Sequence, residues 1–263
     1  MTDENVYSQR HTSESSTLIA TPVWRENPTS QEIEFLRRTD LSNTNVDRWL
    51  CAPEGLDASF YRERFPDWRV RRFPDSVFSS VSSYSQWLTE PDFYEAVADF
   101  QFVTICQLDA VLIKDVTEID MRGLDYLGSA WVPPLKVLTP GNRIYVASEQ
   151  GESQGMWLTR QFGRSLHVGN GGLSVRRVEA HLRATQWLTR HLSDRYRKTT
   201  LEDVLLCAFA HRYGLRIASP KIANGVFLET GAQGLRSVPN VFGFHGLHRW
   251  NPALVERLRA QAS

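Results

Sequence analysis

The chain has 263 residues, 41% of them hydrophobic, which is enough for one large α/β domain or two small ones with a real core. Its 30 basic and 30 acidic residues leave no net charge, so a protein built to coat nucleic acid or an anionic membrane is not expected. The cysteines Cys51, Cys106 and Cys207 are far apart and two lie in apolar runs. This pattern is typical of buried thiols in a reducing compartment rather than of a zinc site.

Residues 1–16 are rich in Ser, Thr, Asn and Glu, and this composition predicts a mobile tail without the apolar segment of a signal peptide. No later apolar run approaches the length of a membrane span. We therefore expect a cytoplasmic protein with at most peripheral membrane contact, and a single domain over residues 17–263.

The first half of the chain alternates two kinds of pattern. Apolar and β-branched segments at 17–23, 47–52 and 68–73, and another that begins at Phe102, predict strands. Helical spacing separates them at 30–38, at 56–65 and from Pro91 onward. The segment 68–73 alternates apolar and basic residues, which suits a strand near a sheet edge. This β-α-β order predicts an α/β fold with a mostly parallel sheet flanked by helices.

A carboxylate, Asp109, stands where the strand from Phe102 should end. Open α/β sheets bind ligands beyond the carboxyl ends of their strands, so Asp109 is a candidate binding residue. An Asp that caps a turn is the structural alternative.

The second half of the chain has weaker patterns. Residues 133–164 combine scattered glycines with polar residues and predict a long loop region. The glycine-rich stretch 167–176 predicts either a hairpin turn or a main chain that a ligand can approach closely. Helices are expected at 178–192, after a cap at Thr200, and at 251–262, with a late strand at 216–220.

Two acids, Glu202 and Asp203, fall in the first turn of the helix expected after Thr200. The helix dipole favours acids there, which is the structural explanation of both. Adjacent residues on a helix do not share a face, so only one of the two is expected to point at a common ligand.

The sequence lacks a Walker-type phosphate loop, a Gly-x-Gly-x-x-Gly after the first strand and a Gly-x-Ser-x-Gly elbow. Enzyme classes that depend on these motifs are therefore not expected.

Four motifs in order resemble one known family. They are Gln107-Leu108-Asp109-Ala110, Asp125-Tyr126-Leu127-Gly128-Ser129-Ala130-Trp131, Gly169-Asn170-Gly171-Gly172-Leu173-Ser174-Val175-Arg176 and Glu202-Asp203-Val204. Together they resemble glycosyltransferase-like proteins found with bacterial surface-polysaccharide genes, from about Thr17 to Trp250. The resemblance implies a GT-A glycosyltransferase fold, a Rossmann-like sheet that binds a nucleotide sugar at its strand ends. It implies a nucleotide-binding part at about 17–131 and an acceptor-binding part at about 132–263.

The same resemblance implies catalytic roles. Sugar transfer needs a base that deprotonates the acceptor hydroxyl. By similarity to inverting GT-A enzymes with a Glu-Asp pair at a helix start, Asp203 is expected to be this base, with Glu202 holding the substrate or the helix. Asp109 matches the first acid of the Asp-x-Asp motif that contacts the ribose and a divalent metal, but Val111 replaces the second acid. Asp109 and His245 would therefore hold Mn²⁺ or Mg²⁺ at a site that is one carboxylate short.

The remaining candidate residues fall into three groups. The nucleotide is expected to contact Thr21, Pro22, Tyr84, Gln86, Gln107, Asp109 and Ala110, and the sugar or acceptor to contact Trp131, Asn170, Gly171 and Gly172. If no metal binds, the leaving diphosphate needs cations, for which the candidates are Arg176, Lys221, His245 and Arg249. Core packing is the alternative for Tyr84 and Trp131. A solvated surface position is the alternative for Arg176, Lys221 and Arg249, and a structural hydrogen-bond donor is the alternative for His245.

The sequence thus predicts a glycosyltransferase that moves a hexosyl or related sugar from a UDP- or GDP-linked donor to a hydroxyl of a glycan or glycolipid, with inversion, in polysaccharide synthesis. Two other classes stay open. One is a protein that binds sugar nucleotides or carbohydrate without turnover, as the incomplete Asp-x-Asp allows. The other is a nucleotidyltransferase on a similar sheet.

Overall fold

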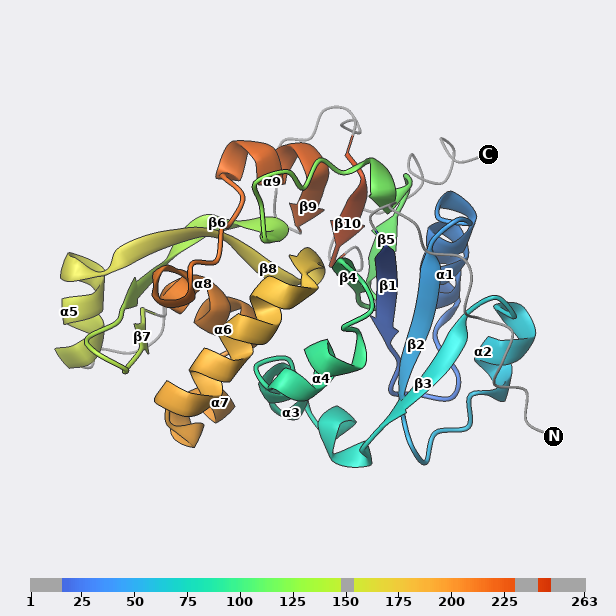
Figure 1. Cartoon of the computed structure of the whole chain (residues 1–263), viewed down its shortest axis with the longest axis horizontal. Helices are drawn as coiled ribbons and strands as arrows, with labels where there is room; N and C mark the ends of the chain where they lie inside the picture. The colour runs from blue at the N-terminus through green and yellow to red at the C-terminus, as the bar shows by residue number, and fades with distance from the viewer. Residues whose placement is uncertain (1–15, 148–153, 230–240, 247–263) are drawn as a thin grey trace.

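A seven-stranded sheet forms the centre of the molecule (Figure 1), in a computed structural model that describes residues 16–147, 154–229 and 241–246. The strand order is β3-β2-β1-β4-β8-β6-β7. Strands β3, β2, β1 and β4 are parallel, whereas β8, β6 and β7 each run antiparallel to the strand before them in this order. The bounds are β1 (Thr17–Pro22), β2 (Asp47–Pro53), β3 (Arg69–Phe73), β4 (Phe102–Cys106), β6 (Tyr126–Leu138), β7 (Tyr145–Val146) and β8 (Arg164–Arg177).

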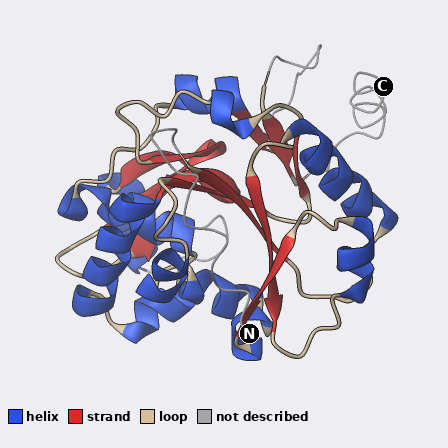
Figure 2. Cartoon of the chain, turned by 45° about the vertical axis from the view of Figure 1, so that its right-hand side comes forward, coloured by secondary structure: helices blue, strands red, loops and turns tan. Residues whose placement is uncertain are grey.

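The parallel half of the sheet confirms the predicted order of strands and helices. Every residue of β4 and nearly every residue of β1 is buried, because helices cover both faces of the sheet (Figure 2). β3 is the edge strand and is mostly exposed, as its alternation of apolar and basic residues predicts. The connecting helices are α1 (Ser30–Ser42), α2 (Ser59–Arg64), α3 (Val81–Trp87) and α4 (Pro91–Ala96), with a 3-10 turn at Asp75–Phe78.

A second, three-stranded sheet joins segments that are distant in sequence. Its order is β5-β10-β9, with β5 at Ala110–Leu112, β9 at Phe227–Glu229 and β10 at Gly243–His245. In its register, His245 lies beside Ala110 on one neighbouring strand and beside Glu229 on the other. The short strand β5 follows β4 directly, so this sheet places His245 and Glu229 near the carboxyl end of the main sheet's central strand.

The prediction of a long loop at 133–164 is wrong. β6 continues to Leu138, β7 follows, and a helix α5 (Gln154–Phe162) precedes β8. The pairing of β6 with β8 shifts register at three places between Gly128 and Leu135. Residues of β6 after Trp131 are largely exposed, so neither a regular alternation nor an apolar run marks this strand in the sequence.

The hairpin turn predicted at 167–176 is wrong, because these residues lie inside the long strand β8, whereas the alternative of a main chain that a ligand can approach closely stays a prediction. Two further local predictions fail. Residues 216–220 contain only a single bridge, from Ile217 to Tyr126, and Ser219 caps the helix α9 (Pro220–Val226). Thr200 is not the N-cap of the next helix, because it is the C-cap of the short helix α7 (Asp194–Thr199) and Leu201 is the N-cap of α8, which begins at Glu202.

The helix predicted at 178–192 is confirmed as α6 (Val178–His191), and α8 spans Glu202–Tyr213. α8 packs on β8 and on α6, and nine consecutive residues from Glu202 to Ala210 are buried in this contact. A further 3-10 turn covers Val116–Glu118. The tail predicted at 1–16 lies outside the described residues except for Ser16, and the helix predicted at 251–262 lies wholly outside them.

The three cysteines are buried and free, in agreement with the sequence-based expectation. Burial raises the pKa of Cys51 and of Cys106 to about 12, so both thiols stay protonated and behave as small apolar groups. Within the described part of the chain, no helix is both long and apolar enough to cross a bilayer.

Candidate functional site

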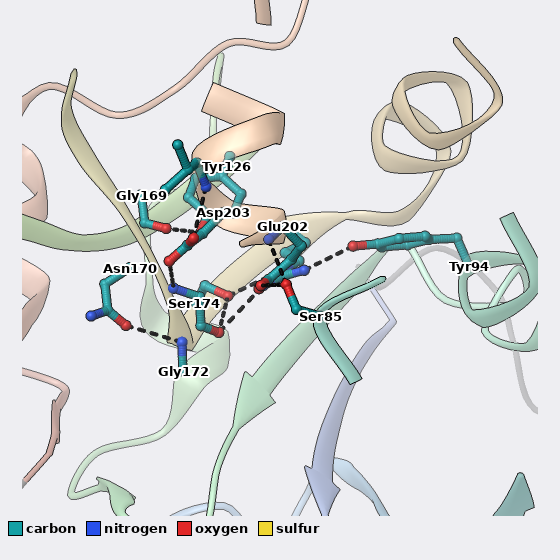
Figure 3. Close-up of polar contacts among 12 residues, drawn as sticks. Ser85, Tyr94, Tyr126, Gly169, Asn170, Gly172, Ser174, Glu202 and Asp203 are labelled. Carbon is teal, nitrogen blue, oxygen red and sulfur yellow. Dashed lines mark hydrogen bonds and ion pairs between the residues drawn. The ribbon is translucent and has the colours of Figure 1, made fainter. Parts of the chain in front are cut away.

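Two buried carboxylates begin α8 and point at different partners (Figure 3). Asp203 Oδ2 accepts a hydrogen bond of 3.1 Å from the backbone N–H of Gly171, and its Oδ1 accepts one of 2.7 Å from the N–H of Val204. Glu202 instead faces Arg176 and Ser85. The divergence agrees with the expectation that adjacent helical acids do not share a face.

A serine from a distant helix holds Glu202 in place. Ser85, in α3, accepts a hydrogen bond of 2.7 Å from the Glu202 N–H and donates one of 3.1 Å to Glu202 Oε2. This reciprocal pair takes the place of a local cap, since Leu201 at the N-cap position makes no side-chain cap. Ser85 therefore fixes both the start of α8 and the direction of the Glu202 carboxylate.

Arg176 is fully buried and its guanidinium is occupied within the protein. It lies 3.1 Å from Glu202 Oε1 and donates to the hydroxyls of Tyr94 and Ser174 and to the Gly171 carbonyl. The sequence suggested a cation for a diphosphate at this position. The structure instead gives Arg176 the role of neutralising Glu202 inside the fold, because a buried charge needs a partner.

The burial of the acid pair has an electrostatic consequence. Removal from water and the nearby charge of Glu202 raise the pKa of Asp203 to about 8, although the N–H groups of Val204 and Gly171 and the charge of Arg176 oppose the shift. Burial and the neighbouring charge thus bring the pKa of Asp203 toward the range in which a general acid or base works best.

The glycines of β8 allow three side chains to approach its backbone. A Cβ at Gly171 would lie 2.2 Å from Glu202 Oε1, and a Cβ at Gly172 would lie 2.1 Å from His245 Nε2. At Gly169 it would lie 2.3 Å from the ring of Trp131. Any side chain at these positions would displace its neighbour, so the glycine run is used for close packing within a strand rather than for a turn.

The second cluster of the site is built around His245. Its Nε2 lies 3.4 Å from Asp109 Oδ1, and its Nδ1 lies 2.7 Å from Glu229 Oε2. Burial disfavours the charged imidazole, but the hydrogen bonds to Asp109 and Glu229 outweigh it and raise the pKa of His245 to about 9. The Asp109 carbonyl also accepts from the Gly246 N–H at 3.0 Å, which ties the end of β10 to the loop after β4.

The two clusters lie on consecutive residues of one strand. Gly171 contacts the acid pair, Gly172 contacts His245, and the Gly172 carbonyl accepts from the Gln107 N–H at 2.9 Å. The structure therefore brings together Gln107, Asp109, Gly171, Gly172, Glu202, Asp203 and His245, all of which the sequence singled out.

A pocket of about 360 Å³ adjoins this region. Residues at or just after the carboxyl ends of β1 and β4 form one part of its lining, and the first half of α3 with the residues before it forms the other: the lining residues are Pro22, Trp24, Phe78, Ser79, Ser80, Val81, Tyr84 and Gln107. Tyr84 is hydrogen-bonded to the side chain of Gln107, and burial raises the pKa of its hydroxyl. An aromatic pocket at the carboxyl ends of parallel strands is where an α/β sheet binds a nucleoside.

The structure leaves several other candidate residues outside the two clusters and the pocket lining, or beside them only. Thr21 is fully buried beneath Pro22 in β1, and the Gln86 amide bonds to Glu90 instead of lining the pocket. Asn170 Oδ1 accepts from the Gly172 N–H at 3.0 Å, and Ala110 is buried beside His245. Lys221 is exposed in α9, and Arg249 lies outside the described residues.

The donor set for a divalent cation is incomplete in the described part of the chain. Asp109 and His245 present one carboxylate and one imidazole, whereas Val111 is buried in β5. Among the described residues there is no group of three His, Cys, Asp or Glu side chains able to share an ion. Such a pair fits Mg²⁺ or Mn²⁺ only when substrate phosphates and water supply the remaining ligands.

Sequence reasoning missed Ser85, Tyr94 and Glu229. Ser85 and Tyr94 contact the acid-pair cluster from 117 and 82 residues away in the chain, so no local spacing marks them. Glu229 is the last residue of the short, otherwise apolar strand β9, much as Asp109 comes after β4, and that position was a usable signal.

Solved structures share this fold at low sequence identity. Galactosyltransferase LgtC, in complex with donor and acceptor sugar analogues, has a TM-score of 0.55 at 11% identity, with 93% of this chain and 95% of that chain covered. Core-mannan synthase A from Aspergillus fumigatus, in a Mn/GDP form, has a TM-score of 0.51 at 10% identity, with coverage of 79% and 73%. The bifunctional glycosyltransferase WbbM has a TM-score of 0.51 at 10% identity, with coverage of 90% and 46%.

These likenesses establish the GT-A glycosyltransferase fold. No curated protein sequence matches the chain. Residues 67–245 match a protein family, and this segment contains the central strand β4, the glycine run and both acidic clusters. The chain belongs to the family described as "Protein of unknown function (DUF5672)".

Proposed function

We propose that this protein is a glycosyltransferase that moves a sugar from a nucleotide-sugar donor to a hydroxyl of a glycan or glycolipid acceptor, in the synthesis of bacterial surface polysaccharide. One observation carries the proposal. In a GT-A fold, consecutive residues of β8 bring a buried acid pair and the Asp109–His245 pair to one place beside an aromatic pocket at the strand ends.

The donor would bind across the pocket and the His245 cluster. The nucleoside would occupy the pocket, where Tyr84 and Trp24 offer aromatic faces and Gln107 offers an amide. The diphosphate would extend from Gln107 toward Asp109 and His245, because Gln107 bonds to Gly172, which lies against His245, and His245 contacts Asp109. LgtC and core-mannan synthase A, which share the fold, have been solved with donor and acceptor sugar analogues and with Mn and GDP.

Asp109 and His245 are the residues that would hold a divalent cation. Bound there, Mn²⁺ or Mg²⁺ would supply positive charge to a leaving diphosphate. The two forms of His245 exclude each other: to hold a cation the ring must be neutral at the ligating nitrogen, whereas without a cation its raised pKa would let the protonated imidazole itself offer positive charge to the diphosphate.

Asp203 would serve as the base of an inverting transfer. The acceptor oxygen would lose its proton to Asp203 and form a bond to the anomeric carbon, while the bond from that carbon to the diphosphate breaks. Arg176 neutralises Glu202, so Asp203 is the member of the pair that is free to take the proton. Trp131 and Asn170, on the β6–β8 side of the acid pair, would form the acceptor wall, with residues of about 132–263 as the acceptor part and 17–131 as the donor part.

The experiment is product analysis with a panel of UDP- and GDP-linked sugars and glycan or glycolipid acceptors. Transfer by the wild-type protein, lost in Asp203→Asn, is the expected result. Binding of a donor without transfer or hydrolysis would support a binding protein, and release of a nucleotidyl product would support a nucleotidyltransferase. The same assay after chelation tests the cation, because full activity in chelator would remove metal from the proposal.

A further inference from the structure

Glu229 lies on the opposite edge of the His245 ring from Asp109. Strands β5, β10 and β9 align Ala110, His245 and Glu229 side by side. The Nδ1 edge of the ring bonds to Glu229 Oε2 at 2.7 Å, and the Nε2 edge lies 3.4 Å from Asp109 Oδ1. A single imidazole is therefore held at both nitrogens, by carboxylates from two different segments.

The two contacts are unequal. The side chain of Glu229 is 18% exposed and that of Asp109 is 33% exposed, so the shorter contact is on the more buried side. Because an exposed ring edge exchanges its partner for water or ligand more readily, Nε2 is the atom available to a bound group. Gly172 lies against this Nε2 end of the ring, where a Cβ would lie 2.1 Å from Nε2, so the absence of a side chain at position 172 leaves room for the ring in this orientation.

Histidines that act on a ligand through one nitrogen commonly bond a carboxylate or carbonyl through the other. This second contact fixes the tautomer and the ring orientation. Glu229 occupies that place for His245, and its own strand is paired in register with β10, so the two side chains cannot slide apart independently.

We propose that Glu229 is a positioning residue, which orients His245 through Nδ1 so that Nε2 faces the diphosphate of a bound nucleotide beside Asp109. The diphosphate in this statement rests on the proposed function. The orientation of the ring rests on the contacts of Glu229 and Gly172 alone. The site with the incomplete Asp-x-Asp motif thereby gains a second carboxylate, that of Glu229 in β9. This carboxylate bonds to Nδ1 of His245, on the far edge of the ring from Asp109.

The test uses Glu229→Gln in the full chain, with Glu179→Gln as the matched control. Glu179 is exposed on α6 and pairs with Arg183, away from the His245 cluster. Two readouts are needed: the ¹⁵N resonances of the His245 ring, and calorimetric affinities for UDP and GDP with and without Mg²⁺. We expect Glu229→Gln to move the Nδ1 resonance and to weaken diphosphate binding by about tenfold or more, while Glu179→Gln changes neither.

A double-mutant cycle separates positioning from a general structural role. If Glu229 acts through His245, then Glu229→Gln added to His245→Ala costs no further affinity. A further loss in that background equal to the loss in the wild type overturns the inference, as do unchanged resonances and affinity in Glu229→Gln. Coupled diphosphate binding without transfer from any donor would refute the proposed function and leave the inference standing. Sugar transfer at the wild-type rate by Glu229→Gln would refute the inference and leave the proposed function standing. Failure of the wild type to bind either UDP or GDP would overturn both proposals.

Discussion

The backbone N–H of Gly171 and the carboxylate of Asp203 are joined by a 3.1 Å hydrogen bond that links a strand to a helix start 32 residues later. The bond is buried, and its donor comes from a residue whose lack of a side chain also makes room for Glu202. A main-chain donor cannot rotate away, so β8 holds the acid pair in a fixed direction. Several consequences of this geometry are measurable.

Replacing the proposed base should abolish transfer without unfolding the protein. Asp203→Asn keeps the size of the side chain and an oxygen that can accept from Gly171, but the amide cannot take a proton. We expect turnover to fall by a factor of about 10² to 10⁴, measured as the rate of sugar transfer. Asp120→Asn, at an exposed carboxylate paired with Arg122, is the control. Normal turnover by Asp203→Asn would exclude Asp203 as the base.

The same variant should change the dependence of stability on pH. The pKa of Asp203 is raised from 3.8 to about 8 in the folded protein, so the folded state binds this proton more tightly than the unfolded chain. This carboxyl therefore favours folding most at low pH, and its contribution declines as the pH rises through about 8. Asp203→Asn should show a shallower decline between pH 4 and 8 in urea denaturation. An identical pH profile would contradict the burial argument.

A methyl group added at Gly171 should disturb the site more than one added at a glycine with open space around it. Gly171→Ala would place its Cβ 2.2 Å from Glu202 Oε1, whereas Gly225→Ala meets nothing within 4 Å and is the matched control. We expect Gly171→Ala to lose about 1–3 kcal/mol of stability through overpacking and to lose transfer activity. Equal stability and activity of the two variants would show that the close contact is unimportant.

Breaking the buried ion pair should be costly. Arg176→Met leaves Glu202 buried without its charge partner, and the expected loss in free energy of unfolding is about 3–5 kcal/mol. Arg176→Met combined with Glu202→Gln should lose less than Arg176→Met alone, because no uncompensated charge remains. Arg183→Met, which breaks the exposed pair with Glu179, should cost no more than about 0.5 kcal/mol. Similar losses for Arg176→Met and Arg183→Met in denaturant titrations would contradict this account.

His181 should make the protein sensitive to acid. It is fully buried, stacks on Tyr94 and lies near Tyr126, and burial together with the charge of Arg176 lowers its pKa to about 3. The unfolded chain binds a proton at His181 below about 6.5 and the folded state does not, so stability should fall as the pH drops from 6.5 toward 3. The slope attributable to one such group is about 1.4 kcal/mol per pH unit.

His181→Phe keeps an aromatic ring between the tyrosines and removes the titrating group. Thermal or urea unfolding across pH 4 to 7 should therefore show a smaller acid-dependent loss than in the wild type. If both proteins lose stability equally on acidification, other groups account for the acid sensitivity.

The parallel half of the fold and most of the residues grouped in the candidate site were predictable because their signals are local. Apolar strands separated by amphipathic helices predict β1 to β4, and the acids Asp109, Glu202 and Asp203 stand directly beyond a strand or at a helix start. The predictions for the irregular strand β6 and for the glycine run of β8 were wrong because the conformation of these residues depends on contacts with residues that are distant in the sequence. Ser85 and Tyr94 reach their partners only through tertiary packing, which no spacing in the sequence records, whereas the position of Glu229 at an apolar strand was a signal that the sequence analysis did not use.

The most direct measurement for the central claim is a crystal structure of the chain with UDP or GDP bound. The account predicts a base seated among Pro22, Tyr84 and Gln107, and a diphosphate whose oxygens lie within bonding or coordination distance of Asp109 or His245. A nucleotide bound on another face of the sheet, with its diphosphate remote from both side chains, would contradict it.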